Sequence, residues 1–149
     1  MARLQFTLNP TAEIVTGTSA KTLVQVVAPT NQRVAILGWG IYFDATSVTA
    51  EPIQVELLRQ TTAGTMSSLT PRKVDSDVGT AIQSTAQHTS TAEPTAGDIL
   101  QSLEVHPQSG YECVFPLGQE FVVPGGGRVG LRVTAPATAN ARVFMRCEE

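Results

Sequence analysis

Short runs in which apolar and polar residues alternate, each closed by a turn-forming residue, recur along most of this chain. Leu4, Phe6 and Leu8 alternate with polar side chains before a turn at Asn9, and residues 98–105 follow the same two-residue period. That period places every second side chain on one face of a strand, and no segment keeps a helical period over successive turns. We therefore predict an all-β chain, an antiparallel β-sandwich of jelly-roll-like form with about eight to ten strands and little or no helix.

The predicted strands are separated by Gly, Pro, Asn or Asp and fit into one domain. They span residues 3–8, 22–28, 33–43, 53–60, 98–105, 111–115, 121–123, 128–134 and 142–147, with weaker candidates at 69–74 and 80–85. A length of 149 residues is enough for one core, so we predict a single β-sandwich domain over 1–149. Residues 1–10 are a possible N-terminal arm. Residues 61–97 form a long polar excursion, expected to hold one or two edge strands or a binding segment.

The single tryptophan lies in the longest of these runs. Trp39 is flanked on one strand face by Leu37 and Ile41, which favours a core position over a platform for sugar stacking. Gly38 and Gly40 leave the opposite face of the strand thin. Glycine inside a strand marks a bulge or a close approach of another backbone, so we expect this strand to bend here between two sheets.

The stretch GGGRVG at residues 125–130 matches the pattern G-x-G-x-x-G. This pattern binds a dinucleotide phosphate when a strand precedes it and a helix follows it. Here apolar residues alternate with polar or small ones over 128–134, which predicts a strand after the glycines. We therefore favour a hairpin turn, in which the glycines supply positive φ, over a nucleotide site. Arg128 and Arg132 are expected to meet solvent or a neighbouring subunit.

Composition limits the classes of partner. Charged residues make up only 15% of the chain, against roughly 25% in a typical soluble domain. Either a biased genome composition or a surface that lies against neighbouring subunits produces such a deficit. A net charge of −3 with scattered Lys and Arg disfavours nucleic-acid binding. No apolar run could span a membrane and the first ten residues contain no signal-peptide core, so we expect synthesis in a cytoplasm and no membrane partner.

No motif in the sequence predicts catalysis, a cofactor or a metal ion. The chain has no G-x-S-x-G, no P-loop, no H-E-x-x-H and no EF-hand loop. Neither His88 nor His106 has a second ligand at metal-binding spacing. Asp75 and Asp77 are better explained by a solvated turn than by a calcium site, which needs more oxygen ligands. We accordingly predict no catalytic, cofactor-binding or metal-binding residues and a non-enzymatic protein.

The two cysteines are predicted to be structural. Cys113 and Cys147 both lie in strand-like runs, and a reducing compartment favours free buried thiols over a disulfide. His106 could serve as a base for Cys113, but no third group is placed to orient it. Glu112 next to Cys113 further disfavours an activated thiolate.

Several strings of this sequence resemble a known family. They are APTNQRVAILGWGIYFD from Ala28, HPQSGY from His106 and PLGQE from Pro116. With them, most of the chain resembles the small jelly-roll capsid decoration, or cement, proteins of tailed bacteriophages. The resemblance implies a virion structural protein on the capsid surface, made in the host cytoplasm. It also implies a homotrimer that binds the major capsid protein and stabilises the shell. These strings are scaffold features, so no site residue is carried over from the family.

Attachment to a capsid could use the first strand. A strand added to a capsid sheet supplies main-chain hydrogen bonds whatever its side chains. The capsid-contact candidates are Arg3, Leu4, Gln5, Phe6, Thr7 and Leu8. Deletion of residues 1–10 is then expected to weaken attachment and leave the fold intact. The competing hypothesis is a receptor- or carbohydrate-binding module of a phage particle, built on the same framework and acting through residues 61–97.

Overall fold

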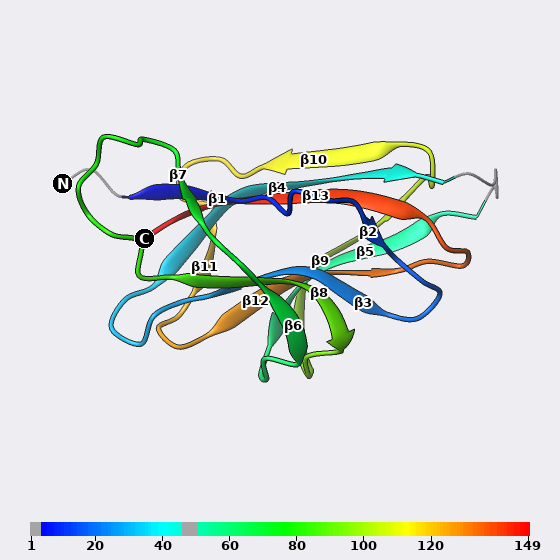
Figure 1. The fold of residues 1–149 in the computed structure, drawn as a ribbon, viewed down its shortest axis with the longest axis horizontal. Coiled ribbons are helices and arrows are strands. Elements are labelled where there is room, and N and C mark those ends of the chain that lie inside the picture. Colours follow the sequence, from blue (N-terminus) through cyan, green and yellow to red (C-terminus); the bar gives the residue numbers. More distant parts are fainter. Residues whose placement is uncertain (1–3, 46–50) are drawn as a thin grey trace.

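The chain folds into two antiparallel β-sheets packed face to face (Figure 1). The computed structural model describes residues 4–45 and 51–149, so Arg3 lies outside the described residues. The described residues form 13 strands and no helix. The predicted all-β antiparallel sandwich is confirmed.

One sheet has seven strands in the order β10-β4-β13-β1-β7, with β11 beside β4 and β2 beside β13. Its strands are β1 (Gln5–Leu8), β2 (Ile14–Val15), β4 (Val34–Asp44), β7 (Arg72–Lys73), β10 (Gly110–Val114), β11 (Phe121–Val123) and β13 (Asn140–Glu148). The other sheet has six strands in the order β6-β8-β3-β12-β5-β9. Its strands are β3 (Lys21–Val27), β5 (Ile53–Gln60), β6 (Thr65–Leu69), β8 (Thr85–Ala92), β9 (Ala96–Val105) and β12 (Arg128–Thr134).

The strand order refines the prediction in two respects. The strand order does not confirm jelly-roll connections. In one sheet β3 pairs with β12 and β8, and in the other β4 pairs with β13 and β10. The strands outnumber the expected eight to ten because β2 and β7 are two residues long, too short to leave an alternating pattern. β8 was missed for another reason, since its sequence TAQHTSTA is polar on both faces.

A single core lies between the sheets, and Trp39 is at its centre. Trp39, Phe6, Ile36 and Met145 are fully buried members of one apolar cluster that includes residues of both sheets. The indole Nε1 of Trp39 donates a hydrogen bond to the side-chain oxygen of Gln101 on β9, 3.1 Å away. Trp39 is therefore a core residue, as predicted, and its ring is not available to a sugar.

β4 carries a bulge that reverses the side-chain alternation. Arg146 of β13 pairs with Gly38, but the next residue of β13 pairs with Ile36, so Leu37 is extra. Ile36 is buried before the bulge, and Trp39 is buried after it. Leu37 and Trp39 thus do not share a face, contrary to the prediction. The strand also stays in one sheet and does not bend between two.

Gly38 is needed where β10 meets β4. A Cβ at Gly38 would lie 2.6 Å from the backbone oxygen of Cys113, which is fixed by strand pairing. Gly38→Ala is expected to lower the free energy of unfolding by about 1–3 kcal/mol through overpacking. Urea denaturation checks this, with Gly79→Ala as a control, because a Cβ at Gly79 meets nothing within 4 Å. Equal stability of the two variants would contradict the close approach.

The first strand is part of the core and not a detached arm. β1 pairs along its whole length with β13, and Phe6 and Thr7 also pair with β7 on the other side. Leu4 is buried and Phe6 and Leu8 are fully buried, whereas Gln5 and Thr7 point outward. These contacts oppose the expectation that residues 1–10 can be deleted without loss of the fold, and we instead expect the deletion to destabilise it.

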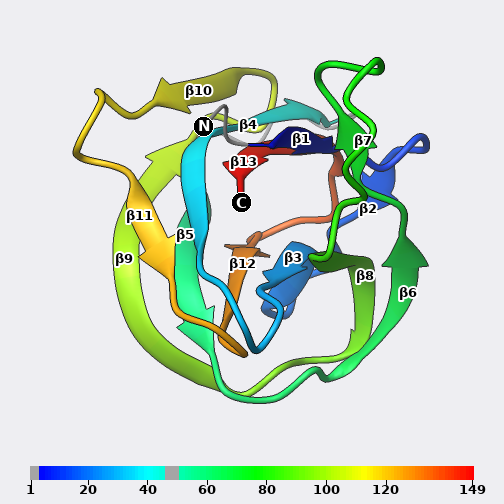
Figure 2. The ribbon, with the colours of Figure 1, turned by 90° about the vertical axis from the view of Figure 1, so that its left-hand side faces the viewer.

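Residues 61–97 form most of a long ribbon. β5 pairs with β9, β6 pairs with β8, and the amide of Thr61 donates to the carbonyl of Thr95 between these pairs. β5–β6 and β8–β9 thus make one continuous antiparallel ribbon, which Figure 2 shows curving around β12 and β3. Part of the polar excursion predicted from the sequence lies in this ribbon, with β6 as an edge strand, and another part contains β7, an edge strand of the seven-stranded sheet.

The glycine-rich turn connects the two sheets. β11 before it belongs to the seven-stranded sheet and β12 after it to the six-stranded sheet, so strand, turn and strand are confirmed but a hairpin is not. Of its glycines only Gly126 has positive φ, at 76°. Gly125 is required by space, because a Cβ there would lie 2.7 Å from the oxygen of Thr30. With a strand in place of a helix after Gly127, the phosphate-binding geometry is absent from this turn.

Candidate functional site

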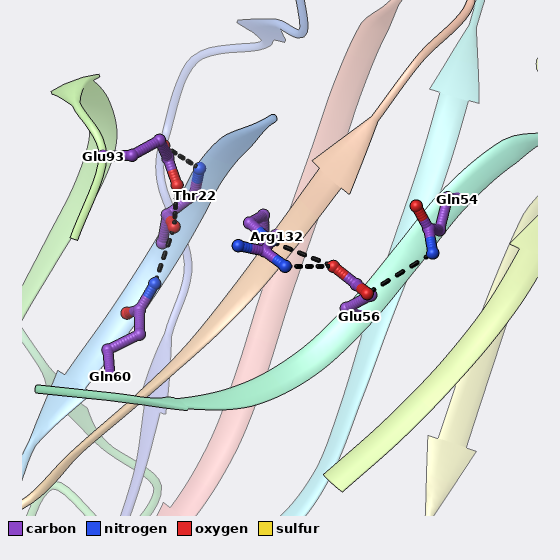
Figure 3. Close-up of polar contacts among 6 residues, drawn as sticks. All are labelled: Thr22, Gln54, Glu56, Gln60, Glu93 and Arg132. Atoms are coloured by element: carbon purple, nitrogen blue, oxygen red, sulfur yellow. Dashed lines mark hydrogen bonds and ion pairs between the residues drawn. The ribbon is translucent and has the colours of Figure 1, made fainter. Parts of the chain in front are cut away.

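An ion pair lies on the side of β12 that faces away from the core. Nε and Nη2 of Arg132 donate to Oε2 of Glu56 on β5 at 2.9 and 2.7 Å (Figure 3). The side chains of Arg132 and Glu56 are only 19% and 6% exposed. The side chain of Arg132 is therefore largely withdrawn from solvent, whereas the sequence pattern predicted it to be exposed. The pair joins the two strands, and its charges are used within the fold.

A second polar network ties β3 to the ribbon. The carboxylate of Glu93 accepts hydrogen bonds from the amide and hydroxyl of Thr22 at 2.6 and 2.8 Å, and from the hydroxyl of Ser90. Nε2 of Gln60 donates to the Thr22 hydroxyl at 2.8 Å (Figure 3). Nε2 of Gln25 in turn donates to Oε1 of Gln60 at 2.6 Å. Because the carboxylate oxygens of Glu93 accept hydrogen bonds from within the protein, Glu93 links the ribbon to β3.

A shallow hollow of about 270 Å³ adjoins Glu93. Hydroxyl-bearing residues line much of it, from residues 16–21 on one side and from Ser90 and Thr91 on the other. The ammonium of Lys21 at its margin donates to the carbonyl of Val15 at 2.7 Å. No aromatic residue lines this hollow, so it lacks the flat apolar surface on which a sugar ring stacks.

The outer face of the seven-stranded sheet carries the most distinctive surface. We define the outer patch as the side chains of Tyr42, Glu112, Arg142, Phe144 and Arg146. Strand register brings them together, because Tyr42 pairs with Arg142, Gly40 with Phe144 and Gly38 with Arg146. On the other edge of β4, Gly40 pairs with Glu112. Two aromatic rings and two guanidinium groups thus occupy one face of three adjacent strands.

Two glycines leave the space that the two rings of the outer patch occupy. The space that a Cβ of Gly40 would take is filled by the ring of Phe144, and the corresponding space at Gly110 is filled by the ring of Tyr42. The rings therefore lie over neighbouring strands and do not stand away from the sheet. A ring that covers an exposed glycine of a neighbouring strand stabilises the pairing and leaves its other face toward solvent.

Polar contacts fix the outer patch. The hydroxyl of Tyr42 donates to Oε2 of Glu112 at 3.1 Å, and Nη2 of Arg146 lies 3.9 Å from Oε1 of Glu112. The guanidinium carbon of Arg146 is 5.3 Å from the centre of the Phe144 ring, within cation-π range. The hydrogen bond to Glu112 raises the pKa of Tyr42, so its hydroxyl stays a donor through the physiological range. Tyr42 is 47% exposed and can contact a partner.

The two thiols differ in burial. Burial raises the pKa of the Cys147 thiol well above its ordinary value, and the Glu149 carboxylate adds to the rise. Cys113 is half-buried, with its sulfur 4.0 Å from Nε2 of Gln101. Both thiols are free; Cys147 is buried, as predicted, but Cys113 is not fully buried.

We expect the native protein to react with Ellman's reagent at one thiol, Cys113, and at the second only on unfolding, because the thiolate of Cys147 is disfavoured and inaccessible. The number of thiols that react before and after addition of denaturant checks this. Cys113→Ser, the control, should abolish the native reaction. Rapid reaction of Cys147 in the native state would contradict the burial of β13.

The residues that the sequence offered as possible metal ligands make local hydrogen bonds instead. Oδ1 of Asp75 accepts a hydrogen bond from the amide of Asp77 at 3.0 Å, the solvated turn that was predicted. Nδ1 of His106 accepts from the amide of Gln108 at 3.2 Å. Within the described ranges, no three His, Cys, Asp or Glu residues are grouped so as to hold a metal ion. These same residues contain no helix long and apolar enough to cross a membrane.

The sequence-based contact candidates and the outer patch share no residue. Of those candidates, Gln5 and Thr7 reach the surface, and their role in attachment stays a prediction. The outer patch was missed because its members come from strands that are distant in sequence. The one signal was the pair Gly38 and Gly40, which indicates that something crosses the strand there but not which side chain.

Comparison of the chain with protein-family models, with curated proteins and with solved structures found no match.

Proposed function

We propose that this chain is a non-enzymatic structural protein of a tailed-bacteriophage particle. It decorates the outer surface of the capsid, binds the major capsid protein as a homotrimer and stabilises the shell. The observation that carries this proposal is the outer patch, where Tyr42, Phe144 and two arginines lie on one rigid sheet face. Aromatic residues and arginine are the types enriched at protein interfaces and at their energetic centres.

Composition and architecture support the same function. A charged content of 15% suits a protein whose surface is covered by neighbours, since charge is depleted at the centre of interfaces. Pairing on both sides of β4 and β13 makes the outer patch rigid. A rigid surface loses little conformational entropy when it binds, so more of its contact energy contributes to affinity. Binding to the folded capsid shell stabilises that shell by mass action.

The outer patch also favours a second candidate, a receptor- or carbohydrate-binding module of a phage particle. The Tyr42 ring lies flat and half-exposed, with a carboxylate and a guanidinium beside it. Sugars combine apolar ring faces with hydroxyl groups, and such a surface provides both stacking and hydrogen bonds. This candidate uses Tyr42 and its neighbours, and not the residues 61–97 that the sequence suggested.

The experiment is a binding assay with capsids that lack this chain. Purified protein is mixed with such particles and the bound fraction is measured against concentration. Tyr42→Ala combined with Arg142→Ala should weaken binding ~10-fold or more, because it removes one aromatic and one arginine anchor. Ile99→Ala is the matched control, since Ile99 is 53% exposed on β9 of the other sheet. It should bind as the native chain does, and both variants should keep the native melting temperature within a few degrees.

One result would exclude the outer patch as the capsid contact, and another would overturn the proposed function itself. Equal capsid binding by the double variant would remove the outer patch from the contact. Saturable binding of a host glycan that is lost with Tyr42→Ala, together with no affinity for capsids, would establish the recognition module instead. A glycan array with the native chain and Tyr42→Ala provides the second measurement.

A further inference from the structure

The β10–β11 loop presents one apolar side chain almost entirely to solvent. β10 and β11 pair with the same edge of β4, one after the other, and residues 115–120 connect them. Leu117 at the tip of this loop is 95% exposed, so it makes almost no contact with its own chain. Val114 and Val122 at the two ends of the loop are exposed as well. A single exposed leucine is ordinary, but three exposed apolar side chains on one loop and its two ends are not.

The loop that carries Leu117 is rigid. The amide of Gln119 donates to the carbonyl of Pro116 at 2.9 Å, and Gly118 has φ of 85°, which closes a type II turn with Leu117 at its second position. The amide of Gly118 also donates to Oε2 of Glu120 at 2.9 Å. At the base, the rings of Phe115 and Phe121 pack edge to face with centroids 4.9 Å apart. Leu117 is thus held in one position, and fixing it in a complex costs little entropy.

An apolar hollow lies across β4 from this loop. It has a volume of about 450 Å³ and is lined by Gln5, Phe6, Thr7, Leu37, Val74, Arg146 and Cys147. Val74 at its margin is 62% exposed. The loop begins beside it, because the amide of Phe115 donates to the carbonyl of Leu37 at 2.9 Å. We call this space the β1–β4 hollow.

We propose that the β1–β4 hollow receives the Leu117 turn of a second copy of this chain. The hollow is not filled by its own Leu117, whose exposure excludes that contact, although the two lie on either side of Leu37. The occupant it fits is a small apolar side chain on a rigid projection, and the chain itself carries one. The loop carries the carboxylate of Glu120 and the margin of the hollow carries the guanidinium of Arg146, so the charges that the contact brings together are opposite in sign.

A contact of this kind repeats from copy to copy. It joins different surfaces of the two partners, and such contacts close into rings when the rotation between copies allows it. Val114 and Val122 beside the turn enlarge the apolar area that is covered. The inference deepens the homotrimer of the proposed function and rests on that part of it alone, not on the capsid.

The test measures self-association of the purified chain by sedimentation velocity over a range of concentrations. Leu117→Asp should weaken self-association ~10-fold or more, because it would place a charge in an apolar hollow. Leu117→Met, which keeps the volume, should assemble like the native chain. Ile99→Asp is the control for an added charge on an exposed apolar position of the other sheet, and it should also assemble.

Disulfide trapping tests which surfaces meet. In a chain with Cys113→Ser, the pair Leu117→Cys and Val74→Cys should form disulfide-linked multimers under mild oxidation. The pair Leu117→Cys and Val15→Cys, with the second thiol on an exposed site away from the hollow, should give far less. Native assembly that Leu117→Asp leaves unchanged would overturn this inference and leave the homotrimer standing. A native chain that is monomeric at every concentration would overturn both, and capsid binding would still be tested separately.

Discussion

Replacing Phe6 with alanine is expected to lower the free energy of unfolding by about 3–5 kcal/mol. Phe6 is fully buried, and it packs in the core cluster as a member of a strand that is paired with β13 and β7. Removing the ring deletes apolar contacts and leaves a cavity that the two sheets cannot close. Urea denaturation followed by tryptophan fluorescence measures the change, because Trp39 lies in the same cluster.

Gln5→Ala is the matched control for Phe6→Ala. Gln5 is the adjacent residue of β1 and points outward, with only an exposed hydrogen bond to Glu148 at 3.3 Å. Its replacement should change stability by no more than about 0.5 kcal/mol. If Phe6→Ala were as stable as Gln5→Ala, the first strand would be the dispensable arm that the sequence suggested. On the present structure, deletion of residues 1–10 should instead prevent folding.

The second large effect is expected at the ion pair between Arg132 and Glu56. Arg132→Met should lower the free energy of unfolding by about 3–5 kcal/mol, because it leaves the nearly buried carboxylate of Glu56 without its cation. Combining Arg132→Met with Glu56→Leu should restore stability to within about 1 kcal/mol of the native chain, since an apolar pair of similar volume avoids desolvation of both charges.

Chemical denaturation of the native chain, the two single variants and the double variant completes this cycle. A more exposed pair serves as comparison, because Nε of Arg142 lies 3.3 Å from Oε1 of Glu13 and the two side chains are 62% and 39% exposed. Arg142→Met should cost less than about 1 kcal/mol. Additive losses in the double variant, with no restoration, would show that Arg132 and Glu56 do not act as a pair.

The alternation of apolar and polar residues was enough to predict the strand content and the packing of two sheets. Runs such as residues 53–60 and 128–134 were placed to the residue, because apolar side chains on one of their faces pack in the core. β8 could not be found this way, since it lies between β6 and β3 and its sequence is polar on both faces. The bulge at Leu37 was also invisible, because it depends on the register between β4 and β13.

The surface depends on long-range pairing even more than the fold does. Tyr42 and Phe144 lie about a hundred residues apart in the sequence and become neighbours only when β4 pairs with β13. Likewise, Arg132 was predicted to be exposed because it alternates with apolar residues, and the ribbon that brings Glu56 beside it could not be read from the sequence. A local pattern specifies which face of a strand is polar, but not what covers that face.

The proposed capsid decoration is tested most directly by the copy number of this chain in purified phage particles. Quantitative mass spectrometry against labelled peptides gives the ratio of this chain to the major capsid protein. A capsid decoration protein should be present in a number comparable to that of the capsid protein. A few copies per particle, confined to the tail, would contradict decoration and favour the recognition module, and absence from the particles would contradict both.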